Sequence, residues 1–246
     1  MVEQPETANK GKPANADLRV RLISAVVMIL VAGAALVLDG LALRLFIVLV
    51  GIGLIYEFAG LVRGFATSPG QVSGWMLAGI AYIGLACFSL ITMPPLLRWT
   101  LIAAVIATDS GAYFSGRRFG GPKIAPAISP SKTWAGLLGG MAGAALVLLG
   151  VWLLVSHRIV DAYHMGYSLA DIVARYPLMA PCLLLLGCLL AVIAQAGDFF
   201  ESWMKRRAGV KDSGALIPGH GGLFDRVDGL LAVSAFTGIL MGIGLI

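Results

Sequence analysis

Apolar residues dominate this chain in long runs that are separated by short polar segments. A helix needs about 20 predominantly apolar residues to cross the hydrocarbon core of a bilayer. Seven runs come close to this length, and they predict spans at about residues 22–38, 43–62, 75–93, 97–115, 134–155, 179–200 and 229–246. We therefore expect an all-α, polytopic transmembrane helical bundle with about seven spans, give or take one or two.

The composition agrees with a membrane protein and excludes several other classes. Of the 246 residues, 59% are hydrophobic and only 13% are charged, whereas charged residues make up about a quarter of a soluble domain. Seven spans use roughly 140 residues, so no sizeable extramembrane domain remains. The three cysteines lie in apolar runs without metal-ligand spacing, which indicates small buried hydrophobic residues rather than disulfides or zinc ligands.

Three segments of the chain differ in character. Residues 1–18 are polar and contain scattered charges and prolines, which predicts a disordered tail. Residues 19–96 contain the N-terminal transmembrane spans, and residues 97–246 form the expected catalytic transmembrane region, because the polar interruptions fall there. The first apolar run is longer than the core of a signal peptide and leads directly into the next span, so we interpret it as a retained anchor rather than a cleaved signal. The polar stretch 156–178 is expected to be a solvated connector with an amphipathic part.

The basic residues are distributed unequally between the two sides of the predicted bundle. A net charge of +5 would suggest a nucleic-acid partner in a soluble protein, but in a membrane protein the sidedness of Lys and Arg is considered first. With a cytoplasmic N-terminus, 14 of the 18 basic residues lie on the cytoplasmic side. We therefore expect an integral protein of the bacterial cytoplasmic (inner) membrane, with its active site facing the cytoplasm and no nucleic-acid partner.

The first polar segment on the cytoplasmic side begins inside a predicted span, at Asp109. An ionised carboxylate at membrane depth costs about 2.5–3.5 kcal/mol, so it requires an explanation. It either packs between helices, bonded to a serine or paired with Arg117, or it forms the polar wall of a site, which we favour. Farther along, Ser131 or Thr133 can cap the next helix, whose free N–H groups, together with Lys132, favour a phosphate site over an ordinary positively charged loop.

The second polar segment, residues 195–228, is the most informative part of the chain. If the preceding helix continues, four polar residues share one of its faces: Asp198, Glu201, Ser202 and Lys205. Asp225 and Asp228 open the last span, and the Gly-rich turn before them can bring them opposite Asp198. Carboxylates gathered in this way repel one another unless a cation lies among them. Hard oxygen ligands without cysteine favour Mg²⁺ over zinc or copper.

These segments carry a family resemblance. The pattern Ser202-x-x-Lys-Arg-x-x-x-x-Lys-Asp-Ser-x-x-x-x-Pro-Gly-His-Gly-Gly-x-x-Asp-Arg-x-Asp228 resembles the signature of phosphatidate cytidylyltransferases. The run from Asp109 to Gly120 and the Ser-Pro-x-Lys-Thr segment are also similar to this family, although Ala135 stands where the family often has Glu. The resemblance implies that CTP and phosphatidic acid give CDP-diacylglycerol and pyrophosphate, with Mg²⁺ alone or beside a second cation, in a membrane-embedded homodimer.

The resemblance and the chemistry of the side chains together assign candidate roles. Asp198 and Asp225 are expected to bind the metal, with Asp228 in support; the catalytic set comprises Asp198, Asp225, Lys205 and Lys211. His220 has either a purely structural role in its turn or a contact with substrate, and we favour the substrate contact. The predicted substrate-binding residues are Asp109, Arg117, Ser129, Lys132, Ser202, Arg206, Asp212, His220 and Arg226.

Two rival functions fit the sequence less well. A transporter also places charges in the membrane, but its site is expected near the midplane between repeated halves, and this sequence has no convincing repeat. A CDP-alcohol phosphatidyltransferase uses a related substrate, but its Asp-Gly-x-x-Ala-Arg motif is absent.

Overall fold

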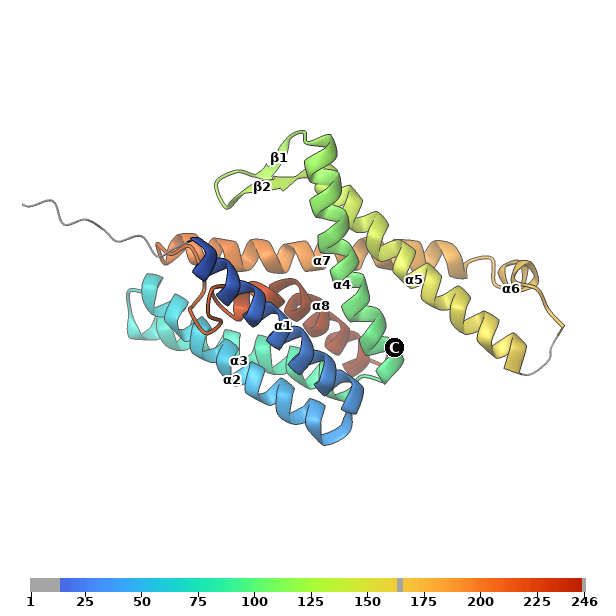
Figure 1. Cartoon of the computed structure of the whole chain (residues 1–246), viewed down its shortest axis with the longest axis horizontal. Coiled ribbons are helices and arrows are strands. Elements are labelled where there is room, and N and C mark those ends of the chain that lie inside the picture. The colour runs from blue at the N-terminus through green and yellow to red at the C-terminus, as the bar shows by residue number, and fades with distance from the viewer. Residues whose placement is uncertain (1–13, 163–165, 245–246) are drawn as a thin grey trace, which may run out of the picture.

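The computed structural model describes residues 14–162 and 166–244, which form eight helices and one two-stranded hairpin (Figure 1). The hairpin was not predicted, although it falls where a loop was expected. The element order is α1 Ala14–Leu38, α2 Gly40–Phe65, α3 Pro69–Thr92, α4 Pro95–Phe119, β1 Lys123–Ala125, β2 Ser129–Thr133, α5 Trp134–Ala162, α6 Leu169–Arg175, α7 Met179–Arg207 and α8 Phe224–Gly242.

Seven of these helices coincide with the seven predicted apolar runs, which confirms an all-α membrane protein. Within the described residues, five are long and apolar enough to cross a membrane: α1, α2, α3, α5 and α7. The other two, α4 and α8, carry charges such as Asp109 and Asp228 within their length, so the count of seven spans stays a prediction. Helix α1 begins at Ala14, inside the predicted tail, and residues 1–13 lie outside the described residues.

Small residues bring helices α4, α5 and α7 into backbone contact. A Cβ atom added at Gly111 of α4 would overlap the backbone of Gly139 in α5, and one added at Gly143 would lie 2.5 Å from the carbonyl oxygen of Ala107. Gly187 of α7 is pressed in the same way against the backbone of α5. Such contacts are typical of helices that associate in lipid.

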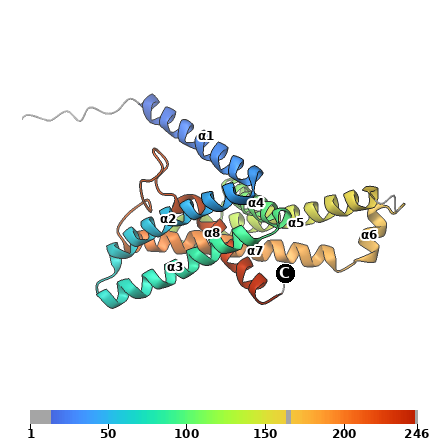
Figure 2. The same ribbon diagram turned by 90° about the horizontal axis from the view of Figure 1, so that it is seen from below.

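The N-terminal helices attach to α7 and α8 through aromatic side chains. Trp75 of α3 contacts both Phe65 of α2 and Trp203 of α7, with ring centroids 5.5 and 5.8 Å away. Deeper in the bundle, the ring of Phe58 fills the space beside Gly79, and it lies 6.3 Å from the ring of Phe224 at the start of α8. Helix α1 stands apart from the other helices along much of its length (Figure 2).

The segments predicted to be cytoplasmic lie at the same end of the bundle. Ser24 of α1 donates a hydrogen bond to the carbonyl oxygen of Pro218 (2.8 Å), and Gly64 near the end of α2 packs against Ala208 at the end of α7. At the opposite end, Arg98 of α4 forms a 2.8 Å ion pair with Asp39, and this hydrogen bond lowers the pKa of Asp39. The polar segments that were separated in sequence are thus gathered at one end.

Candidate active site

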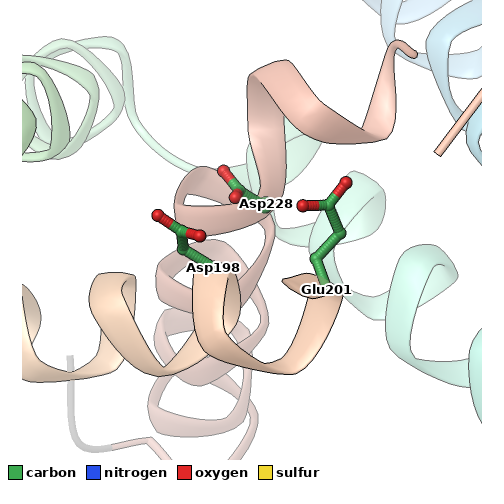
Figure 3. A group of neighbouring side chains, drawn as sticks. All are labelled: Asp198, Glu201 and Asp228. Carbon is green, nitrogen blue, oxygen red and sulfur yellow. The ribbon is translucent and has the colours of Figure 1, made fainter. Parts of the chain in front are cut away.

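Three carboxylates form a compact group where α7 and α8 meet. Asp198 and Glu201 project from neighbouring positions on one face of α7, and Asp228 faces them from the second turn of α8 (Figure 3). One ligand oxygen from each lies within 4.8 Å of the other two. The two helices can meet so closely because Gly197 packs directly against the carbonyl oxygen of Asp228. The structure therefore brings together Asp198 and Asp228, which the sequence placed in one site.

Glu201 is the most deeply buried member of this group, with only 1% of its surface exposed. Its Oε2 atom lies 2.8 Å from the Nζ atom of Lys205, whereas its Oε1 atom is buried and has no hydrogen-bond partner in the described part of the chain. An unpaired buried carboxylate oxygen is costly. A cation among the three carboxylates would satisfy it, so the donor set fits a hard metal ion.

Asp225 belongs to a different set of contacts from Asp198. Its Oδ1 atom lies 2.5 Å from the Nζ atom of Lys205, and its Oδ2 atom accepts hydrogen bonds from both the backbone and the hydroxyl group of Ser213 and from the backbone of Gly222, each at 2.9 Å. A metal ion at Asp225 would have to share or displace the Lys205 contact. The metal role expected for Asp225 therefore stays a prediction, while Lys205 links Asp225 to Glu201.

A polar cavity of about 650 Å³ opens beside the carboxylates, between α4, the hairpin, α5 and α7. Lys132 connects the cavity to the carboxylate group, because its ammonium pairs with Asp198 and lies 5.9 Å from the centre of the Phe199 ring. Asp109 lines the same cavity, as expected for the wall of a site. The polar and charged lining residues are Asp109, Tyr113, Arg117, Lys123, Ser131, Lys132, Thr133, Gln195 and Asp198.

The N-terminus of α5, which lines this cavity, is capped as the sequence predicted. The hydroxyl oxygen of Thr133 accepts a hydrogen bond from the backbone N–H of Gly136 (3.1 Å), so Thr133 rather than Ser131 makes the cap. Arg117 donates a hydrogen bond to the hydroxyl group of Tyr113 (2.8 Å), one turn earlier on α4. The guanidinium of Arg117 is thus held at the cavity by its own helix.

Most of the remaining predicted residues lie in or near the loop between α7 and α8. Lys211 and Asp212 are exposed there, and Ser202 donates a 3.3 Å hydrogen bond to Asp198. The backbone of His220 is held in a turn: its N–H donates to Ile217, and its carbonyl oxygen accepts from Arg226. The Nδ1 atom of the His220 ring is buried and has no partner in the described residues, so both interpretations of His220 stay open.

Two predicted residues lie at the edge of this arrangement. Arg206 reaches the hairpin, where its Nε atom donates to the carbonyl oxygen of Ile128 at 3.4 Å. Ser129 is buried in β2, next to that contact, and it does not line the described cavity. The structure therefore places these two residues where the hairpin meets the end of α7.

Three residues at the site were given no role from the sequence. Glu201 was placed on the polar face of its helix, and its i, i+3 spacing from Asp198 was the available signal. Gln195 is 4% exposed, and both polar atoms of its amide lack a partner in the described chain although the side chain lines the cavity. Glu57 is a buried carboxylate. Its position within an apolar run was the available signal, because a charged residue at membrane depth is a candidate for a functional role.

Comparison with known proteins identifies the family. The model of the cytidylyltransferase family matches residues 75–243. A protein of Rickettsia typhi named phosphatidate cytidylyltransferase is 30% identical over 240 residues, which cover 97% of this chain and 98% of the relative. A protein of Brucella suis with the same name is 41% identical over 168 residues, which cover 66% of this chain and 55% of the relative. This chain thus spans little more than half the length of the Brucella relative. Because the family model matches more than half of this chain, the chain belongs to the cytidylyltransferase family.

Proposed function

We propose that this protein is a phosphatidate cytidylyltransferase, which converts CTP and phosphatidic acid into CDP-diacylglycerol and pyrophosphate. The observation that carries the proposal is the connected row of charged side chains at one end of the bundle, which runs from Lys132 and Asp198 through Glu201 and Lys205 to Asp225. It borders a polar cavity in a chain of membrane-spanning character, where a lipid and a soluble polyanion can meet. The names of the relatives support this substrate pair.

The proposed reaction needs alignment and charge neutralisation more than proton transfer. A phosphate oxygen of phosphatidic acid attacks the α-phosphorus of CTP, the bond from that phosphorus to the bridging oxygen of the β-phosphate breaks, and pyrophosphate leaves with the electron pair. The attacking oxygen is already ionised near neutral pH, so a dedicated general base is not required. Holding the two phosphates in line accounts for much of the rate enhancement in such transfers.

The carboxylate group is the proposed site for Mg²⁺. Asp198, Glu201 and Asp228 would hold the ion, and the unpartnered oxygen of Glu201 is the feature that fits it best. When bound, Mg²⁺ would neutralise charge on the phosphate oxygens. The Mg²⁺ requirement of Asp225→Asn tests the predicted participation of Asp225, and a second cation stays a prediction.

The cationic side chains divide between the two substrates in this proposal. Lys132 and Arg117 line the cavity and would bind the phosphate of the lipid, whose acyl chains hold it at the membrane surface. Lys205 lies between Glu201 and Asp225, and it would contact the triphosphate together with Lys211, Arg206 and Arg226. Charge-assisted contacts of this kind are the strong hydrogen bonds of phosphate recognition.

The proposed setting is the bacterial cytoplasmic membrane, with seven spans, the site facing the cytoplasm and the chain acting as a homodimer. The gathering of the basic segments at one end of the bundle supports this orientation. A reporter that is active only in the cytoplasm, fused after Ile246, is expected to be inactive. Activity of that reporter would contradict the odd number of spans, and cross-linking in native membranes tests the dimer.

One assay tests the activity itself. Purified protein in mixed micelles receives phosphatidic acid, Mg²⁺ and each nucleoside triphosphate in turn. We expect a CDP-lipid and pyrophosphate with CTP or dCTP, and neither product with the other nucleotides. Absence of a CDP-lipid with CTP overturns the proposal. Transfer of a CDP-linked lipid to an alcohol would instead indicate the phosphatidyltransferase rival, and uptake of an anion into vesicles without turnover would indicate the transporter.

A further inference from the structure

Glu57 is a carboxylate on α2, in the part of the chain that precedes the family match. Only 2% of its surface is exposed, although it lies in an otherwise apolar run. A buried charge is tolerated only where hydrogen bonds or opposite charges compensate for its lost hydration. The partners of Glu57 therefore indicate what this carboxylate does.

These partners all belong to the loop and helix that follow α7. The Oε1 atom accepts a hydrogen bond from the backbone N–H of Leu223 (3.0 Å), and the Oε2 atom accepts one from the backbone N–H of Phe224 (2.8 Å). These are the first amides of α8, where helical N–H groups lack partners within the helix, and Leu223 offers no side-chain cap of its own. Glu57 thus caps α8 from another helix, at the end that favours a negative charge.

The loop leaves space for this carboxylate. A Cβ atom added at Gly214 would overlap the Oε1 atom of Glu57, and one added at Gly222 would lie 2.8 Å from its Oε2 atom and would overlap the hydroxyl group of Ser213. Neither glycine has a positive φ, so space rather than backbone conformation explains why glycine suits both positions. The loop is therefore folded closely around the Glu57 side chain.

Ser213 connects Glu57 to the charged residues of the site. Its hydroxyl group lies 3.2 Å from Glu57 and 2.9 Å from Asp225, and it can donate its single hydrogen to one carboxylate at a time. Asp225 in turn contacts Lys205, which pairs with Glu201. A continuous set of contacts therefore runs from α2 to the carboxylate group.

We infer that Glu57 is a positioning residue for nucleotidyl transfer: it fixes the start of α8 and the loop 208–223, and through them the places of Asp225 and Lys205. The inference rests on the proposed function, and it assigns Glu57 no contact with substrate. The loop carries Lys211, whereas the lipid phosphate is assigned to the cavity on the other side of α7. Loss of the Glu57 contacts should therefore weaken the use of CTP rather than the use of phosphatidic acid.

The test compares Glu57→Gln with wild type in mixed micelles. The glutamine amide group would direct its own N–H toward one of the two backbone N–H groups, so one of the contacts is lost. Hydrogen bonds to charged groups are worth about 1.5–3 kcal/mol, which predicts a fall in kcat/KM for CTP of roughly 10- to 150-fold. The KM for phosphatidic acid, expressed as surface mole fraction, should stay unchanged. The amides of Leu223 and Phe224 should exchange hydrogen faster.

A matched control on the same helix separates positioning from stability. Leu43→Ala removes packing from a buried side chain of α2 in a separate cluster with Ala35 and Ile47, so it should lower the melting temperature and leave the KM for CTP and the two amides unchanged. Ser213→Ala serves as a second variant, since it removes only the connecting hydroxyl group. We expect it to lower turnover by roughly 3- to 10-fold.

The outcomes are distinct. Folded Glu57→Gln with wild-type CTP kinetics and wild-type exchange at Leu223 and Phe224 would overturn the inference, and unchanged turnover in Ser213→Ala would overturn the connection to Asp225. If the wild-type protein made no CDP-lipid, the proposed function would fail. Hydrogen exchange would then still report whether Glu57 holds the loop, so the two failures can be distinguished.

Discussion

The polar cavity and the loop 208–223 flank α7, yet their polar groups are satisfied differently. Around the loop, Glu57 and Asp225 accept hydrogen bonds from backbone amides and from Ser213, so the polar atoms there are largely paired with one another. In the cavity, the buried amide of Gln195 has no partner within the described residues, and Lys132 pairs with Asp198. Around Glu57 and Asp225 the loop is therefore organised internally, with the unpartnered Nδ1 atom of His220 as the exception within the described residues, whereas the cavity leaves polar groups available to a ligand.

This difference separates positioning from binding. A saturated network resists displacement, because breaking one contact leaves a buried charge uncompensated. Groups without partners gain hydrogen bonds only when a ligand arrives. The carboxylate group lies between the two regions, and its unpartnered Glu201 oxygen makes it resemble the cavity more than the loop.

The largest expected effect comes from the carboxylates between the two regions. Asp198→Asn and Asp228→Asn each keep the shape of the side chain but weaken a proposed metal ligand. We expect turnover to fall at least about 100-fold, since metal-assisted charge stabilisation is worth several kcal/mol. The concentration of Mg²⁺ that gives half-maximal activity should rise. Near-normal turnover of both folded variants at saturating Mg²⁺ would remove the metal assignment.

Asp225→Asn decides the role of the third aspartate in the same assay. A raised Mg²⁺ requirement supports the metal role expected from the sequence. Lower turnover at an unchanged Mg²⁺ requirement assigns Asp225 to the contacts that it makes with Lys205 and Ser213.

The next effect separates the lipid side from the nucleotide side. Lys132→Ala should chiefly raise the KM for phosphatidic acid, and Lys211→Ala should chiefly raise the KM for CTP. Loss of one charge-assisted phosphate contact is worth about 1.5–3 kcal/mol, or roughly 10- to 150-fold. Arg44→Ala, at the opposite end of the bundle, is the control for a general charge effect. If Lys132→Ala weakened the use of CTP alone, the assignment of the two regions would have to be exchanged.

A smaller effect is expected at Gln195, where the unpartnered amide faces the cavity. Gln195→Met keeps a similar volume and removes both unpaired polar atoms, so the melting temperature should stay the same or rise. If a substrate uses the amide, the KM for that substrate should rise roughly 5- to 30-fold, which corresponds to about 1–2 kcal/mol. Unchanged kinetics for both substrates would show that the Gln195 amide does not contact them.

The smallest effect is expected from Ser202→Ala. Ser202 donates a 3.3 Å hydrogen bond to Asp198 from the next turn of α7, and loss of an ordinary hydrogen bond costs about 0.5–1.5 kcal/mol. Turnover should therefore fall roughly 2- to 10-fold without a change in stability. A fall as large as that of Asp198→Asn would mean that Ser202 itself contacts substrate or metal.

Much of the helical framework was predictable, because apolar runs of span length leave few alternatives. All seven predicted runs became helices, and the continuation of α7 to Lys205 placed Asp198 and Glu201 on one face. The cap at Thr133 followed from its position before an apolar run. These features depend on residues that are close in the sequence, which is why pattern alone could find them.

Other features depend on contacts that sequence patterns do not encode. The hairpin at residues 123–133 lacks the alternation of apolar residues that identifies a strand. Glu57 and Ser213 are 156 positions apart, so only the packing of α2 beside the loop could reveal their contact. The spacing of Asp225 and Asp228 put both on one face of a helix, but Asp225 lies in the first turn, where the loop returns and surrounds it.

Helix α4 has a consequence for how the protein enters the membrane. It carries Arg98 at one end, Asp109 in its second half and two arginines in its last turn, and it is not among the helices that are apolar enough to cross by themselves. Its backbone contact with α5, through Gly111 and Gly139, forms only after α5 has been synthesised. Stable integration of α4 should therefore wait for α5, and a bulky residue at Gly139 should leave α4 accessible to water-soluble labels during biogenesis.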